Sequence, residues 1–290
     1  MGPGGRALAI DIAWLGSSSP RRVLVHSSGL HGVEGFAGSA IQIALLERGL
    51  RIPADAAVVF VHVLNPYGMA WLRRVNENNV DLNRNFGTRD EDRAGASAEY
   101  RRLDPLLNPP SAPGADLFYL LAAWNVLRHG PRPLRQAIAE GQYEFPGGLF
   151  FGGAELERGP ALFQDWLARH LTAPKRICAI DVHTGLGRWG RESLGGAYTI
   201  RGGYRHAFDV LPQRPQVSAV TQEFGTYSSL RVLHALREEN RCHHYGAPDI
   251  SHPAKRRLKE MFAPASESWR RFVVERGVAL FDATLQGGWA

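Results

Sequence analysis

Short apolar runs separated by turn residues dominate the first 65 positions of the chain. Residues 7–14, 23–25 and 56–64 are short and apolar, which favours buried strands over helices. Residues 37–50 place their apolar side chains at helical spacing, and this pattern stops near Gly49. Strands that alternate with a helix in this way predict parallel pairing, with helices covering the sheet.

Two further apolar segments continue the pattern in the second half of the chain. Residues 177–182 are typical of a buried strand, and residues 217–223 predict another. We therefore expect an α/β fold with a mixed, mostly parallel central sheet flanked by helices. Residues 253–285 have the pattern of one or two amphipathic helices.

The middle of the chain interrupts this alternation. Residues 104–116 are rich in proline and predict neither helix nor central strand, and residues 141–153 are rich in glycine and aromatic side chains. Between them, residues 117–129 predict a helix. We interpret the chain as one domain, residues 1–290, in which residues 88–160 form an insertion over the sheet with loops near a site.

Composition narrows the function classes only slightly. The 34 Lys+Arg against 28 Asp+Glu give a net charge of +6. The lysines are only Lys175, Lys255 and Lys259, and the arginines are scattered along the chain. No basic motif therefore indicates nucleic-acid binding. A 44% hydrophobic content excludes intrinsic disorder, and no apolar run approaches the ~20 residues that span a bilayer.

The cysteines and the N-terminus bear on localisation. Cys178 lies in an apolar run, and with Cys242 as the only other cysteine there is no disulfide framework. The first residues carry no apolar signal segment. We therefore expect a cytoplasmic protein.

Candidate chemistry begins with His31 and Glu34, which follow a predicted strand and a turn. A histidine and a glutamate three residues apart on a turn can both reach one metal ion. His183 ends another predicted strand, at the sheet edge where ligands of open α/β folds bind. Two histidines and one glutamate, with one position left for water, are typical of catalytic zinc.

Two polar segments could complete such a site. Residues 78–86 hold asparagines and an arginine, and the pair Asn83 and Arg84 suits a substrate carboxylate, because a guanidinium can bind it with two hydrogen bonds. Glu223 ends a predicted strand, and a carboxylate there could accept a proton from metal-bound water. Each segment alone is also compatible with an ordinary polar loop.

Taken in order, these motifs resemble the M14 zinc carboxypeptidase family, and most closely its DUF2817 branch. The resemblance extends over residues 7–290. It implies that zinc is bound by His31, Glu34 and His183. The other roles that it implies are Asp81 orienting a zinc histidine, Glu223 as general base and acid, Asn83 and Arg84 receiving a substrate carboxylate, and Arg74 polarising the scissile carbonyl.

The resemblance leaves several points open. Arg73 competes with Arg74, and the family's substrate-facing tyrosine could be Tyr198, Tyr204 or Tyr227. The implied substrate is a peptide. The zinc ligands are also similar to those of the aspartoacylase and succinylglutamate desuccinylase deacylases, which cleave N-acyl amino acids.

A non-catalytic binding protein on the same scaffold is a further alternative, and we expect neither a nucleic-acid nor a membrane partner. Members of the branch carry additional N-terminal sequence, so an edge element is expected to be missing. The oligomeric state does not follow from the sequence.

Overall fold

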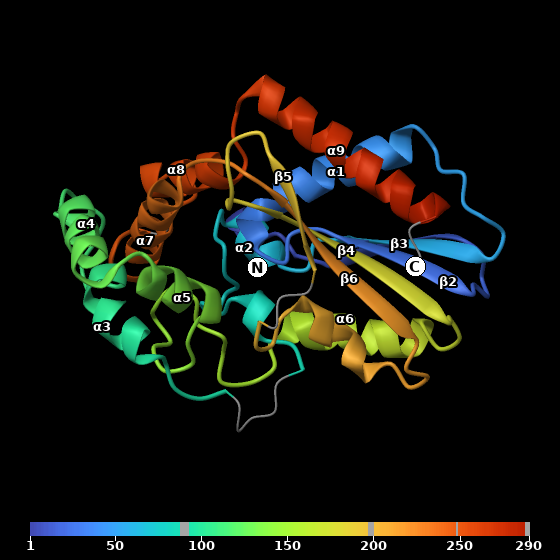
Figure 1. Cartoon of the computed structure of the whole chain (residues 1–290), viewed down its shortest axis with the longest axis horizontal. Helices are drawn as coiled ribbons and strands as arrows, with labels where there is room; N and C mark the ends of the chain where they lie inside the picture. Colours follow the sequence, from blue (N-terminus) through green and yellow to red (C-terminus); the bar gives the residue numbers. More distant parts are fainter. Residues whose placement is uncertain (88–92, 197–199, 248, 288–290) are drawn as a thin grey trace.

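The computed structural model describes residues 1–87, 93–196, 200–247 and 249–287. Within these ranges six strands form one sheet, in the order β1-β3-β2-β4-β6-β5 (Figure 1). The strands are β1 (Asp11–Gly16), β2 (Arg22–Ser27), β3 (Ala56–His62), β4 (Arg176–Thr184), β5 (Glu192–Gly196) and β6 (Gln216–Phe224).

Four neighbouring strands, β3, β2, β4 and β6, are parallel, and the edge strands β1 and β5 are antiparallel to their neighbours. The predicted mixed, mostly parallel sheet is confirmed. Parallel strands bury both faces, which explains why β3 is buried along almost its whole length. Their carboxyl ends share one edge of the sheet, and the loops that leave this edge carry the candidate site.

Helices α1 (Gly35–Glu47) and α9 (Glu267–Gln286) cover one face of the sheet (Figure 1). Their close approach depends on Gly277, because a Cβ atom there would lie 2.3 Å from Ile41. The opposite face is covered by α6 (Arg158–His170) and the 3-10 helix η5 (Tyr204–Val210), through Phe163 and Phe208. Alternate residues of β2 point into these two cores.

A helical lobe lies beside the sheet and has its own hydrophobic core (Figure 1). Its helices are α3 (Ala98–Leu107), α4 (Phe118–His129), α5 (Arg132–Glu140), α7 (Ser229–Tyr245) and α8 (Pro253–Phe262). The expectation that the insertion of residues 88–160 lies over the sheet is therefore wrong for α3 to α5, because their apolar faces pack together with α7 and α8. Residues 88–92 of that insertion lie outside the described residues.

Most predicted elements are present with shifted ends. The first strand covers residues 11–16 rather than 7–14, because its pairing with β3 begins at Asp11 opposite His62. Helix α3 continues to Leu107 through Pro105, although residues 104–116 were expected to be non-helical. Leu103 and Leu107 are buried on one face of α3, and this packing outweighs the hydrogen bond lost at the proline.

Short helices and the C-terminal pair complete the described chain. The short helices are η1 (Pro3–Gly5), η2 (Gly32–Glu34), α2 (Pro66–Ala70) and η3 (Leu82–Arg84). Helices α8 and α9 confirm the prediction for residues 253–285. Among the described helices, none combines the length and apolar character that crossing a bilayer requires.

Candidate metal centre and active site

The site begins at the turn that follows β2. His31 precedes the single 3-10 turn η2, and Glu34 ends that turn. The turn is fixed to the segment after β3, because the Val33 N–H donates to the Arg73 carbonyl at 2.8 Å. A Cβ at Gly32 would lie 2.2 Å from the Gly68 backbone, so this approach requires glycine. The backbone itself therefore places residues 73–74 beside His31.

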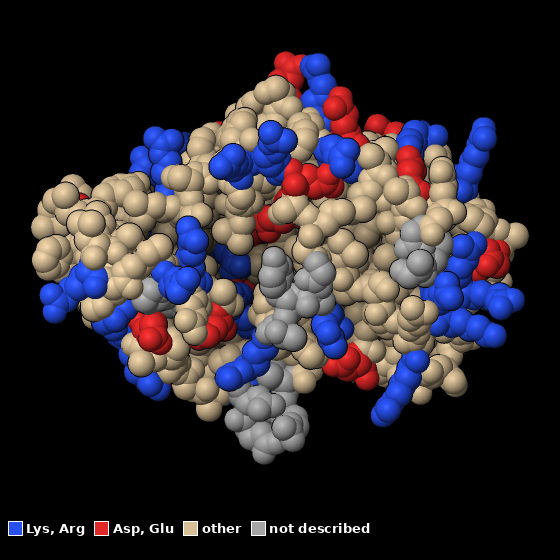
Figure 2. All heavy atoms as spheres, in the orientation of Figure 1, with Lys and Arg blue, Asp and Glu red and all other residues tan. Residues whose placement is uncertain are grey.

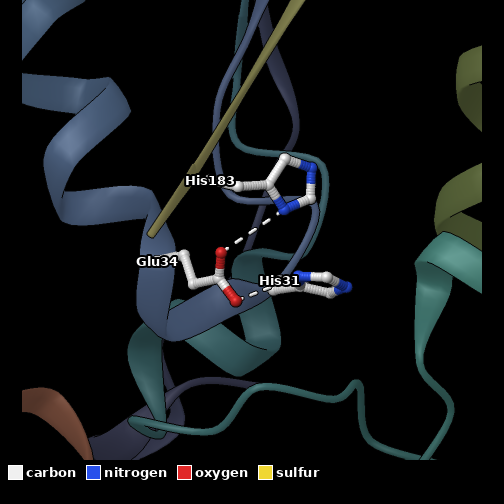
Figure 3. Close-up of side chains that lie close together, drawn as sticks. All are labelled: His31, Glu34 and His183. Atoms are coloured by element: carbon white, nitrogen blue, oxygen red, sulfur yellow. Dashed lines mark ion pairs between the residues drawn. The ribbon is translucent and has the colours of Figure 1, made fainter. Parts of the chain in front are cut away.

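Three predicted metal ligands converge at this edge of the sheet. One ligand atom from each of His31, Glu34 and His183 lies within 4.8 Å of the others, and all three side chains are buried. Glu34 lies between the two rings, with one carboxylate oxygen facing each (Figure 3). Its Oε1 is 3.0 Å from Nδ1 of His31, and its Oε2 is 3.4 Å from Nδ1 of His183.

The remaining nitrogen of each ring contacts a second buried carboxylate. His31 Nε2 is 2.9 Å from Asp81 Oδ1, and His183 Nε2 is 2.5 Å from Asp181 Oδ2. Such contacts hold the orientation of both rings and would keep the proton on Nε2 when Nδ1 binds a metal ion. Nδ1 of each ring faces Glu34, which is an arrangement suited to a cation between them. The buried donor set of two imidazoles and one carboxylate fits zinc.

Asp181 is a site residue that the sequence reasoning did not assign. It lies on β4 two residues before His183, on the same face of the strand, and accepts a hydrogen bond from Ser27 at 2.8 Å. The Asp-x-His spacing was the available signal, because alternate residues of a strand share a face.

The charges of the three ligands depend on one another. Burial disfavours a charge on Glu34, but His31 and His183 outweigh it and hold the pKa of the Glu34 carboxyl below its usual range. Burial likewise opposes a charge on His183, whereas Asp181 and Glu34 raise the pKa of that ring well above its usual value. The cluster thus stabilises positive charge at its centre.

Glu223 reaches the same edge from β6. It pairs with His183 in the parallel register, so the two side chains share one face of the sheet. Its Oε1 accepts a hydrogen bond from the Leu186 N–H at 2.8 Å. Burial and the negative charge of Glu34 raise the pKa of Glu223 to about 8. This carboxyl therefore exchanges a proton near neutral pH.

Arg73 and Arg74 point to different places. The Arg74 guanidinium pairs with Asp81, and its Nη2 lies 2.8 Å from Nε2 of His31. Burial opposes its charge, but Asp81 and Glu34 outweigh that and raise the pKa of Arg74. Arg73 instead pairs with Glu239 on α7. Of the two arginines, only Arg74 contacts the candidate ligands.

Asn83 and Arg84 follow Asp81 in η3. Asn83 accepts a hydrogen bond from the Tyr204 N–H at 2.9 Å. Arg84 pairs with Asp81 and donates to the Ile138 carbonyl at 2.8 Å, and its Nε has no hydrogen-bond partner among the described atoms. The ring of Phe150 lies 5.7 Å from the Arg74 guanidinium and 5.8 Å from that of Arg84, so it links the two.

The three candidate tyrosines have different surroundings. Tyr198 lies outside the described residues. Tyr204 is buried in an aromatic cluster with Phe86, Phe163 and Phe208, and the Tyr227 hydroxyl donates to Glu260 at 2.7 Å. Neither of these two has a hydrogen bond that joins it to the three candidate ligands.

The model of the family described as "Protein of unknown function (DUF2817)" matches residues 1–195 and 192–276. The chain belongs to the DUF2817 family. No curated protein matches its sequence.

Solved structures provide distant similarities. Murein-tripeptide amidase MpaA from Escherichia coli O157 is 16% identical with a TM-score of 0.37, over 79% of this chain and 85% of that one. Carboxypeptidase A from Helicoverpa armigera is 14% identical with a TM-score of 0.39, over 93% and 69%. A putative succinylglutamate desuccinylase / aspartoacylase family protein from Shewanella amazonensis SB2B is 17% identical with a TM-score of 0.37, over 74% and 61%.

Proposed function

We propose that this DUF2817 protein is a zinc-dependent hydrolase of the metallocarboxypeptidase type, which cleaves an amide bond next to a free carboxylate. One observation carries the proposal. Both imidazoles present Nδ1 to the same carboxylate, Glu34, while their Nε2 atoms contact Asp81 and Asp181. Two imidazole nitrogens and a carboxylate that converge in this way can bind one cation together.

His31, Glu34 and His183 would hold the ion and leave a further position open. A bound zinc supplies a Lewis acid and lowers the pKa of a coordinated water to ~7. The chain contributes the orientation: Asp81 and Asp181 keep both rings turned toward the ion, which strengthens their basicity. Burial keeps bulk water away from these charges.

Glu223 is the proposed general base. It reaches the edge of the sheet beside His183, and its elevated pKa suits a group that takes a proton near neutral pH. It would remove the proton from the attacking water and then pass it to the departing amine. The Leu186 N–H holds one carboxylate oxygen, so the other is left for the proton.

Arg74 and the pair Asn83 and Arg84 would position the substrate. Arg74 carries a buried positive charge beside His31, where it would stabilise the negative charge developing on the carbonyl oxygen. Arg84 and Asn83 would receive the free carboxylate of the substrate. The unpartnered Nε of Arg84 supports this role, because a buried donor without a partner favours binding of an acceptor.

Metal content tests whether the protein binds zinc through the proposed ligands. Elemental analysis of protein purified without chelator should find one zinc per chain, and His31→Ala should lose it. An exposed substitution such as His170→Ala is the matched control and should retain the metal. Wild-type protein with less than ~0.1 zinc per chain would contradict the assignment, since three-ligand catalytic sites bind tightly.

Substrate panels test which amide bond the protein hydrolyses. Zinc-loaded protein should release C-terminal residues from dipeptides and short peptides. Hydrolysis of N-acyl amino acids alone would replace the peptidase proposal with the deacylase alternative. If neither panel is cleaved by metal-loaded protein, the protein is not a hydrolase of this type.

A further inference from the structure

Helix α4 presents a continuous apolar face to solvent. Leu120, Trp124 and Leu127 are 68%, 60% and 82% exposed, whereas Phe118 and Ala122 on the opposite side are buried in the helical lobe. We call the exposed face the α4 seam, and its residues are Leu117, Leu120, Leu121, Trp124 and Leu127. In Figure 1 α4 occupies the outer end of the lobe, on the side away from the sheet.

The spacing of the seam is that of a helix-packing surface. Its residues follow the pattern i, i+3, i+4, i+7 and i+10, which places them along one stripe of the helix. Isolated exposed apolar residues need no explanation, but a full stripe does. Helix α4 is therefore apolar on two faces, and only one of them is used inside the described chain.

The area of the seam is close to what a stable protein interface needs. Its other two leucines, Leu117 and Leu121, are 62% and 47% exposed. Taking about 150–250 Å² for a large apolar side chain, the exposed parts leave about 600 Å² of apolar surface. A monomer rarely exposes a patch of this size, and a standard interface buries roughly 800 Å² on each partner.

The charges around the seam constrain its partner. Residues 117–127 contain no charged side chain, Asp116 precedes them, and Arg128, Arg132 and Arg135 follow. In Figure 2 the corresponding end of the molecule is largely tan, with basic side chains next to it. A partner with the same seam in parallel would bring the arginines together. In the antiparallel direction they are separated, and Asp116 is already paired with Arg237 and Arg241 of its own chain.

We propose that two copies of this chain associate through the α4 seam, with the two helices antiparallel. Such an interface is isologous, so each contact occurs twice. Leu117 of one copy lies opposite Leu127 of the other, and Leu120 lies opposite Trp124. This pairing matches apolar surface to apolar surface over the length of the helix.

The oligomeric state in solution is the first test. Wild-type protein should have twice the 32.0 kDa chain mass by light scattering. The variants Leu120→Glu and Trp124→Glu should each weaken dimerisation at least about 100-fold, and the double variant should be monomeric. Ile43→Glu, an exposed apolar residue on α1, is the matched control and should remain dimeric. Far-UV circular dichroism establishes that each variant is folded.

Cysteine cross-linking tests the direction of the helices. Residues 117 and 127 are about 15 Å apart along the helix axis, and a disulfide requires Cα atoms within about 7 Å. The double variant Leu117→Cys with Leu127→Cys should therefore form a covalent dimer under mild oxidation. Leu117→Cys alone should not, and wild-type protein, whose two cysteines are buried, should not either.

Four outcomes would overturn the proposal. The proposal is contradicted if wild-type protein stays monomeric at ~100 μM, or if the double variant Leu120→Glu with Trp124→Glu remains dimeric. Cross-linking of Leu117→Cys alone would show parallel helices. Co-sedimentation of monomeric wild-type protein with phosphatidylglycerol vesicles, lost in Trp124→Glu, would assign the seam to a membrane surface instead.

Discussion

Two buried polar clusters meet at adjacent residues, Arg73 and Arg74, and they differ in how their charges are balanced. Arg73 enters a cluster on the α7 side, where its Nε donates to Glu239 at 2.9 Å. Lys255 from α8 donates to the same carboxylate at 2.5 Å. Burial disfavours a charge on Glu239, but Arg73 and Lys255 outweigh it and lower its pKa. In this cluster two cationic donors therefore face one carboxylate acceptor.

The cluster around Arg74 is built differently. Four carboxylates gather there: Glu34, Asp81, Asp181 and Glu223. In the ligand set one nitrogen of each imidazole faces Glu34, and the other nitrogen contacts Asp81 or Asp181. Two imidazoles and a carboxylate therefore converge on one point. The comparison shows that burial of charge is not itself a functional signal. What distinguishes the site is a set of groups whose mutual orientation is favourable with a cation among them.

The largest expected effect separates catalysis from metal binding within the site. Replacing Glu223 with glutamine removes the proposed proton acceptor and leaves the three candidate ligands in place. We expect kcat to fall by about 10²–10⁴ with zinc content unchanged, measured by turnover and elemental analysis on the same preparation. If metal-loaded Glu223→Gln retained turnover, Glu223 would be excluded as the general base.

The second effect tests whether the Arg73 cluster is structural. Glu239→Gln leaves two buried cations, Arg73 and Lys255, without a compensating charge, and should lower the free energy of unfolding by about 3–5 kcal/mol. Urea unfolding measures this, with the exposed Glu275→Gln as control at under about 0.5 kcal/mol. If the folded variant instead lost zinc at unchanged stability, the two clusters would not be separate.

A third prediction concerns His26, a buried ionisable residue with no charged hydrogen-bond partner. It packs against Phe60 and Phe281, and its Nδ1 is 3.3 Å from the Gln42 amide nitrogen. Burial lowers the pKa of His26 to about 4. The unfolded chain therefore binds a proton at higher pH than the folded one, and stability is lost as the pH falls from about 6.5 toward 4.

The size of this loss can be measured by comparison with a variant. Between about pH 7 and pH 4.5, His26 should contribute about 2.5 kcal/mol to the decrease in the free energy of unfolding. His26→Gln should lack this contribution, whereas His170→Gln, at an exposed position, should behave like wild type. Equal pH dependence in wild type and His26→Gln would show that the ring is not neutral in the folded protein.

The smallest effect tests the carboxylates behind the candidate metal ligands. Asp181→Asn weakens the contact that orients His183 and should reduce zinc affinity by about 10–100-fold. Competition with a chromophoric chelator measures the affinity. Asp165→Asn, at an exposed position on α6, is the matched control and should leave it unchanged. An unchanged affinity in Asp181→Asn would mean that Nε2 of His183 needs no acceptor.

The parts of the fold that the sequence predicted are those with strong local patterns. The buried strands β2, β3 and β4 were recognisable from their short apolar runs, which are typical of parallel strands covered on both sides. Helix α7 was not recognised, because residues 237–241 are all polar. Arg237 and Arg241 are buried because they pair with Glu238 on the same helix and with Asp116 from a distant part of the chain.

The sequence by itself indicated where five of the six described strands, β1 to β4 and β6, lie along the chain. It also gave the chemical types at the strand ends: His31 with Glu34, His183 and Glu223. The tertiary structure alone decided which neighbours these groups meet. It placed Arg74 rather than Arg73 beside His31, put Asp181 behind His183, and left one apolar face of α4 exposed. Residue type and local spacing are carried by the chain, whereas the pairing of charges depends on contacts between segments far apart in sequence.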